Sequence, residues 1–314
     1  MTALQDIRIF PYLTPNPLKE NSFLEESWIS WFPNYKTGDT ADGLPSFFHE
    51  ENIAYFEKIE NFVSQQFRTA LQRMWPLFEG IYIEQIQISI DFLISTNPHT
   101  LASYIPQKSN PAMGKYIFSL NRNLLSRYLY TLEGREGLIP KKNIWEHELV
   151  HLLDHWQIVN AQAFANSENP SNAFTYYLLK YREEGIANLH DLLDGKLSGP
   201  ISRAEATEKF ILNVQQTKKI LEEYPNLQRK EKLKLFSGYE FYELGPWLIL
   251  EKMEELIAQT ELEPIRALEE KIAAGVPISD ESKLAYLKYA LLIDNEWFLS
   301  SCSRNPLISS SSWE

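Results

Sequence analysis

The stretch NIWEHELVHLLDHW at residues 143–156 determines how the rest of the chain is interpreted. Its first residue, Asn143, suits a helix N-cap, and Glu146 three residues later can complete a capping box. Its apolar side chains recur at helical spacing and predict a buried helix face: Trp145, Leu149, Leu152 and Trp156. His147 and His151 are four residues apart, so they project from one side of this helix.

Residues 147–151 read HELVH, which is an HExxH motif. Two imidazoles one helical turn apart can bind a single metal ion. Glu148 follows the first imidazole and is placed to accept a proton from a water molecule that the metal activates. Bare HExxH sequences also arise by chance, and the alternative is a helix whose histidines are exposed or packed in the core.

A zinc ion held by two histidines needs a third protein ligand and one open position. Downstream, residues 176–190 read YYLLKYREEGIANLH. Together with HExxH, the Glu-Gly-x-Ala segment at residues 184–187 resembles the gluzincin branch of the zincin metallopeptidases, over residues 143–193. The resemblance implies one Zn²⁺ per chain, with Glu184 as its third ligand and Glu183 as the alternative.

The resemblance also implies a tyrosine that stabilises the oxyanion. In anthrax lethal factor-like zincins a tyrosine precedes the ligand glutamate by seven residues, and Tyr177 occupies a similar position. A Tyr-x-x-Gly segment after the ligand helix resembles several gluzincins and implies Tyr242, which fits that pattern better than Tyr239. For both Tyr177 and Tyr242 the alternative is an aromatic side chain packed in the core.

Other polar residues near the motif have predicted supporting roles. Asp154 either orients a ligand imidazole or faces solvent. His155 lies one turn beyond His151, and a straight helix cannot wrap three ligands around one ion, so His155 is expected to support the site or lie at the surface. Asp191 is on the ligand face of its helix and can support the site, whereas His190 is expected to be exposed.

Composition excludes several classes of protein and site. The 314 residues include 42 acidic and 30 basic side chains, a net charge of −12, which argues against binding to nucleic acid. The single cysteine, Cys302, excludes an intramolecular disulfide and Cys-based zinc sites, which leaves histidine and carboxylate ligands. The sequence carries neither a signal peptide pattern nor a long apolar run, so we expect no membrane partner and a cytoplasmic location, with signal-independent secretion as the alternative.

The pattern of apolar residues predicts an α+β fold. A helix is expected over residues 46–75, strands within 81–93 and over 115–121, and a short helix near 124–132. Helices then follow at residues 143–159, 171–194, 202–224, 238–259, 263–274 and 279–293. Gly185 inside a helix costs about 1 kcal/mol relative to alanine. We expect close approach of this helix to the HExxH helix to explain that cost.

These elements predict four parts. They are an irregular arm (1–45), an α/β subdomain ending in the HExxH helix (46–160), a helical subdomain with the third ligand (161–300) and a tail (301–314). The resemblance implies that the fold is zincin-like, with a small mixed sheet before the active-site helix. It also implies that strand 115–121 is a sheet edge able to pair with an extended peptide.

The predicted function is that of a zinc-dependent metallopeptidase acting on a peptide or protein substrate, with Glu148 as general base. One alternative is a catalytically inactive, zincin-like helical interaction protein, against which the complete His-Glu-His-Glu set speaks. The other is a different zinc-dependent amide hydrolase, which the Glu-Gly-Ile-Ala segment disfavours. The sequence leaves the oligomeric state open.

Overall fold

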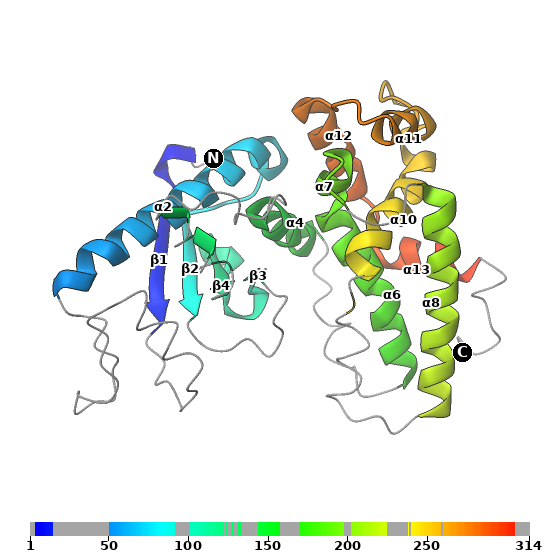
Figure 1. The fold of residues 1–314 in the computed structure, drawn as a ribbon, viewed down its shortest axis with the longest axis horizontal. Helices are drawn as coiled ribbons and strands as arrows, with labels where there is room; N and C mark the ends of the chain where they lie inside the picture. Colours follow the sequence, from blue (N-terminus) through cyan, green and yellow to red (C-terminus); the bar gives the residue numbers. More distant parts are fainter. Residues whose placement is uncertain are drawn as a thin grey trace. The chain divides into compact units, whose positions relative to one another are not determined.

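In a computed structural model, the chain divides into two compact units, residues 1–148 and 149–314 (Figure 1). The division falls inside a single helix, α4 (Ile144–Gln157). The structure describes residues 4–14, 50–91, 101–121, 124, 127–128, 131–132, 144–157, 170–197, 202–224, 238, 240–258 and 260–304. The expected boundaries at residues 45 and 160 lie outside the described residues.

The first unit contains a small mixed sheet, as expected. Its strands are β1 (Arg8–Thr14), β2 (Gln85–Asp91), β3 (Ala102–Tyr104) and β4 (Lys115–Asn121). Their spatial order is β1-β2-β4-β3, with β1, β2 and β4 mutually parallel and β3 antiparallel to β4. Ile86 and Ile88 are fully buried, which confirms the alternation predicted for that strand.

Two strands differ from the prediction. β1 lies within residues 1–45, which were expected to be irregular, and it contains Pro11. Proline has no backbone N–H to donate and is tolerated on an edge strand, the position that β1 occupies in the described sheet. β3 has only three residues, too few for a periodic pattern, and it covers the far side of β4. Strand 115–121 is therefore an inner strand, and the expectation that it forms the edge is wrong.

Helix α2 (Glu50–Met74) packs the first unit together. Its buried side chains recur about every four residues, which agrees with the predicted helix: Ile59, Val63, Phe67 and Leu71. The Phe67 ring meets Phe118 of β4 edge-on, with 4.9 Å between centroids, and Trp145 of α4 with 5.1 Å. The first turns of α4 are thus fixed by the core of this unit. Short 3-10 helices are η1 (Leu4–Asp6), η3 (Trp75–Phe78), η4 (Pro106–Lys108) and η5 (Pro111–Met113).

The second unit is helical in all its described elements, which confirms the expected change along the chain. Its further helices are α6 (Pro170–Ala187), α7 (Leu189–Leu193), α8 (Arg203–Glu223), α10 (Glu240–Ile257), α11 (Ile265–Ala273), α12 (Asp280–Ala290) and α13 (Asn295–Ser303). The helix predicted over 171–194 is divided at Asn188, whose side-chain amide donates to the carbonyl of Glu184 at 2.8 Å. Helix α13 was not predicted, and the carboxylate of Asp294 caps it by accepting from the Trp297 N–H at 2.7 Å.

Helices α6 and α10 run side by side in close contact (Figure 1). At their crossing two glycines face each other, and a methyl group added to Gly185 would lie 2.6 Å from the carbonyl carbon of Gly245. Gly185 therefore permits close approach to α10, and the expected approach to the HExxH helix is not the reason for this glycine. Pro246 lies inside α10, which continues past it.

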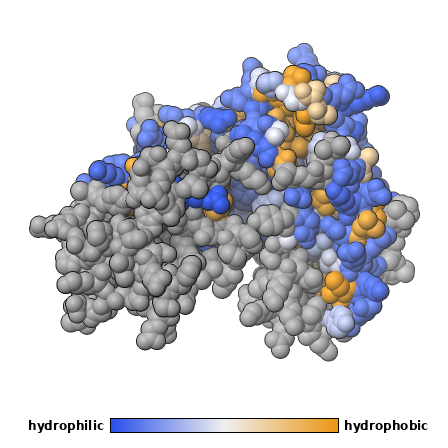
Figure 2. Space-filling model, in the orientation of Figure 1, coloured by the Kyte–Doolittle hydropathy of each residue, from blue (hydrophilic) through white to orange (hydrophobic). Residues whose placement is uncertain are grey.

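The described surface on the face drawn in Figure 2 is mostly hydrophilic. Large apolar side chains exposed among the described residues include Leu212, Tyr224 and Leu292, a feature that folded proteins commonly show. Within the described residues, the helices are too short or too polar to cross a membrane.

The Gly185–Gly245 contact predicts the sign of one substitution. Gly185→Ala should lower the free energy of unfolding by about 2 kcal/mol, because the added methyl group overpacks the α6–α10 contact. Helix propensity alone would raise it by about 1 kcal/mol. Urea unfolding measures the free energy of unfolding and so distinguishes the two effects. The control is Glu208, an exposed residue of α8, where the difference in stability between Glu208→Ala and Glu208→Gly measures helix propensity alone. A Gly185→Ala protein more stable than the wild type would contradict the packing.

Candidate metal centre

Helix α4 carries the HExxH motif with the expected orientation. Trp145, Leu149 and Leu152 are buried, so one side of the helix is fixed in the core. His147 and His151 are both partly buried and lie one turn apart. Glu146, the candidate partner of Asn143 in a capping box, is buried in an ion pair with Arg73 at 2.9 Å; Asn143 lies outside the described residues.

Three of the predicted ligands come together. His147, His151 and Glu184 of α6 each offer one ligand atom, and these atoms lie within 4.8 Å of one another. The group could hold a metal ion, because two imidazole nitrogens and one carboxylate oxygen are a common donor set for zinc. The burial of Glu184 also suits it to bind a cation, since a buried carboxylate needs a positive partner.

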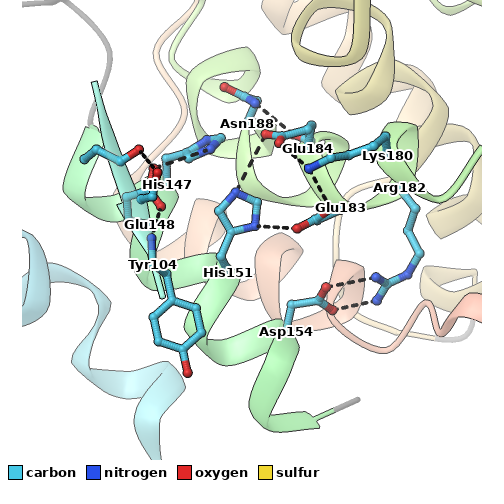
Figure 3. A network of polar contacts seen from close by, with 12 residues as sticks. Tyr104, His147, Glu148, His151, Asp154, Lys180, Arg182, Glu183, Glu184 and Asn188 are labelled. Carbon is cyan, nitrogen blue, oxygen red and sulfur yellow. Dashed lines mark hydrogen bonds and ion pairs between the residues drawn. The ribbon is translucent and has the colours of Figure 1, made fainter. Parts of the chain in front are cut away.

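Two neighbouring carboxylates flank the two nitrogens of the His151 ring (Figure 3). Glu184 Oε2 lies 3.7 Å from Nε2, and Glu183 Oε1 lies 3.8 Å from Nδ1. Glu183, the alternative ligand from the sequence, therefore lies on the other side of the imidazole from Glu184. The imidazole nitrogen on the Glu184 side is the one suited to bind the same ion as Glu184.

Lys180 links the two carboxylates. Its ammonium donates to Glu183 Oε2 at 2.9 Å and to Glu184 Oε1 at 3.1 Å. Burial alone lowers the pKa of Lys180, but the charges of Glu183 and Glu184 outweigh it and hold this pKa well above its usual value. Lys180 is therefore charged at neutral pH and balances one of the two negative charges.

Glu148, the predicted general base, is buried and held by the edge strand. Its Oε2 accepts a hydrogen bond from the backbone N–H of Tyr104 at 2.7 Å, and its Oε1 lies 4.0 Å from His147 Nε2. Ile105 donates its N–H to Ile117 of β4, so the N–H of Tyr104 points away from the sheet. The carboxylate thus has one oxygen fixed by the backbone and the other directed to His147 (Figure 3).

Asp154 has neither of the roles considered from the sequence. It accepts two hydrogen bonds from Arg182, at 2.9 and 2.6 Å, in the parallel geometry typical of strong guanidinium–carboxylate pairs. Arg182 is 2% exposed and also donates from Nε to the carbonyl of Ile293 at 2.6 Å. This pair ties α4 to α6 and to the segment before α13, so Asp154 has a structural partner.

The other histidine predictions have mixed outcomes. His155 is partly buried, and burial lowers its pKa while the charge of Asp154 opposes the change. His190 was expected to be exposed, but it is buried in α7 with Nδ1 at 3.5 Å from Asp194. Asp191 is buried in the same short helix and is not a member of the triad. The reason is that α7 packs inside the second unit, which the helical spacing alone did not indicate.

Of the two predicted tyrosines, Tyr177 has contacts that place it in the core of the second unit. Tyr177 is buried in an aromatic cluster, with its hydroxyl 3.1 Å from that of Tyr181 and its ring edge-on to Phe241. Tyr242 lies partly buried on α10, and Tyr239 lies outside the described residues. The position of Tyr177 therefore favours packing over a role as oxyanion donor.

Sequence reasoning missed Tyr176, which lies among the charges of the site. Burial raises the pKa of Tyr176, the ammonium of Lys180 lowers it, and the carboxylates of Glu183 and Glu184 raise it. Tyr176 lies four, seven and eight residues before these three residues, the spacing of one helix face. That spacing is the signal that identifies it.

Comparisons with known proteins do not assign the chain to a family. Models of protein families, curated proteins and solved structures were compared, and none matches.

The Asp154–Arg182 pair predicts a loss of stability without a loss of metal affinity. Asp154→Ala should lower the free energy of unfolding by about 3 kcal/mol, because it leaves the charge of Arg182 buried without its carboxylate. Zinc affinity, measured under folding conditions by chelator competition, should stay within about twofold because Asp154 is not a ligand.

The exposed Arg203–Glu254 pair provides the control. Glu254→Ala should cost less than about 1 kcal/mol, since Glu254 is largely solvent-exposed. A tenfold loss of zinc affinity in Asp154→Ala with unchanged stability would instead support a role for Asp154 in orienting a ligand.

Proposed function

We propose that this protein is a zinc-dependent metallopeptidase that hydrolyses peptide bonds in a peptide or protein substrate. The observation that carries the proposal is the convergence of His147, His151 and Glu184 within 4.8 Å, next to the carboxylate of Glu148. Catalytic zinc sites commonly have three protein ligands and a fourth position left open for water or substrate. A structural zinc site would have all four positions taken by the protein.

The proposed chemistry assigns each residue a separate task. A zinc ion bound by the triad supplies Lewis acidity and lowers the pKa of water. Glu148 takes the proton of the attacking water and passes it to the leaving amine. Its hydrogen bond from the Tyr104 N–H supports this role, because it fixes the carboxylate before substrate arrives.

The proposed binding site for an extended substrate is the outer side of β3, the side away from β4. β3 is the antiparallel edge of the described sheet, and its residue Tyr104 contacts Glu148 through the backbone. A peptide added to this edge would pair with outward backbone groups of β3 other than the Tyr104 N–H, which Glu148 engages, and would lie beside the general base. This antiparallel edge, the mixed sheet and the HExxH helix together support the zincin-like architecture as part of the proposal.

The two alternatives differ from the proposal in what Glu148 does. In a catalytically inactive zincin-like protein Glu148 would have no proton to transfer. The hydrogen bond from the Tyr104 N–H, which fixes Glu148 beside His147, therefore favours the catalytic proposal. In another amide hydrolase Glu148 keeps its role, but the substrate is a small amide. The edge strand β3 favours a peptide, since small amides make no use of a sheet edge.

Replacement of the general base tests the proposal. Glu148→Gln should lower peptide turnover by about 10²–10⁴-fold, the usual contribution of a general acid–base group, and should still bind one zinc per chain. His147→Ala should lose the zinc as well. Zinc content and cleavage of a peptide library measure both effects.

The exposed residue Glu222 gives the matched control, and Glu222→Gln should behave as wild type. Full turnover in Glu148→Gln would overturn the assignment of the base. Hydrolysis of small amides but not of peptides would support the alternative hydrolase.

A pair of tyrosine substitutions tests which hydroxyl serves the reaction. Tyr176 lies on the same face of α6 as Lys180 and Glu184, and we infer that it donates to the oxyanion, so Tyr176→Phe should lower kcat by about 10²-fold with unchanged stability. Tyr177→Phe should keep its turnover and lose about 1 kcal/mol of stability, because the buried hydroxyl of Tyr181 loses one of its two partners among the described residues and keeps only Asn213. Kinetics and thermal unfolding separate the two, and loss of turnover in Tyr177→Phe alone would reverse the assignment.

A further inference from the structure

Four side chains form a closed ring of polar contacts beside the triad. The ring runs from Lys180 to Glu183, to His151, to Glu184 and back to Lys180, with distances of 2.9, 3.8, 3.7 and 3.1 Å. Each glutamate therefore uses one oxygen toward Lys180 and the other toward His151 (Figure 3). The ring includes two of the three residues proposed as ligands.

Two adjacent carboxylates next to one metal site create an ambiguity. Either glutamate could bind the ion, and either could bind through both of its oxygens, because carboxylates accept both modes. The contacts of Lys180 remove much of this freedom. Its ammonium engages Glu184 Oε1 and leaves Oε2 on the side of His151 Nε2.

Glu183 is directed to the second nitrogen of the same imidazole. Its Oε1 lies 3.8 Å from Nδ1, while Lys180 engages its Oε2. A histidine that binds a metal through one nitrogen usually donates its other N–H to a carboxylate, a backbone carbonyl or water. Glu183 is in the place of that acceptor, which the sequence had suggested Asp154 could occupy.

We propose that Lys180 and Glu183 are positioning residues of the metal centre. Lys180 restricts Glu184 to binding through one oxygen and keeps Glu183 from binding the ion, while Glu183 orients the imidazole of His151. This inference rests on the metal centre of the proposed function, but it does not depend on peptide hydrolysis.

Metal binding tests the proposal without any assay of turnover. Glu183→Gln should weaken zinc binding by about 10–100-fold, measured by chelator competition, and should retain one zinc per chain. Glu184→Gln should weaken it further, because it removes a ligand charge. Lys180→Met should release Glu184 Oε1 and raise the coordination number, which weakens the visible absorption of bound Co²⁺.

Two lysine variants separate positioning from a general effect of charge or folding. Lys180→Arg keeps the positive charge and a donor and should retain the wild-type Co²⁺ spectrum. Lys252→Met removes a lysine of equal side-chain exposure, 19%, that pairs with Glu251 away from the triad, and it should change neither the spectrum nor the affinity. Circular dichroism checks that each variant is folded.

Three results would overturn the proposal. Glu183→Gln and Lys180→Met could both match Lys252→Met in affinity and spectrum, which would leave the ring without effect on the metal. Glu183→Gln could abolish zinc binding while Glu184→Gln retains it, which would make Glu183 the ligand. A wild-type protein that binds neither Zn²⁺ nor Co²⁺ would overturn both this inference and the metal centre.

The positioning role of Lys180 and Glu183 and the proposed peptidase activity can fail independently of each other. If Glu148→Gln retains full peptide turnover while Glu183→Gln weakens zinc binding, the catalytic assignment fails and the positioning role stands. If Glu148→Gln loses turnover and the ring variants bind metal as wild type does, the reverse holds.

Discussion

The free-energy cost of burying a charged group determines which partners the acidic residues of α4 and α6 must have. A buried carboxylate without a partner is expensive, so each acidic residue here must meet a donor or a cation. Glu146, Glu148 and Glu184 are all 6% exposed or less. Four acids on α4 and α6 show this pairing: Glu146 with Arg73, Glu148 with the Tyr104 N–H, Asp154 with Arg182, and Glu184 with Lys180.

These partners divide similar side chains between different tasks. Both oxygens of Asp154 accept from the guanidinium of Arg182, so the charge of Asp154 is neutralised by an ion pair that holds α4 and α6 together. Glu184 meets an ammonium through one oxygen and has its other oxygen near an imidazole, an arrangement that leaves it able to bind a cation. Glu148 has a backbone donor in place of a cation, which keeps its charge available for proton transfer in the proposed reaction. The identity of the partner therefore separates structural acids from proposed functional ones.

Much of the triad and of the helical fold could be predicted from the sequence, because the helical repeat is local. It places His147 and His151 on one side of α4, and the structure adds Glu184 as expected. The partners of Asp154 and Gly185 could not be predicted, since both are set by chain segments far away in sequence. β3 could not be predicted for a related reason. Its three residues are too few to show a period, and the strand forms by backbone pairing with β4.

The location of a bound ion tests the central claim most directly. Anomalous X-ray scattering at the zinc edge, from crystals of the zinc-loaded protein, would place the ion without any assumption about its ligands. The account predicts one zinc ion bonded to a nitrogen of His147, to Nε2 of His151 and to a single oxygen of Glu184, at about 2.0–2.2 Å. A zinc ion bound elsewhere, or an anomalous map without a peak between these three side chains, would contradict it.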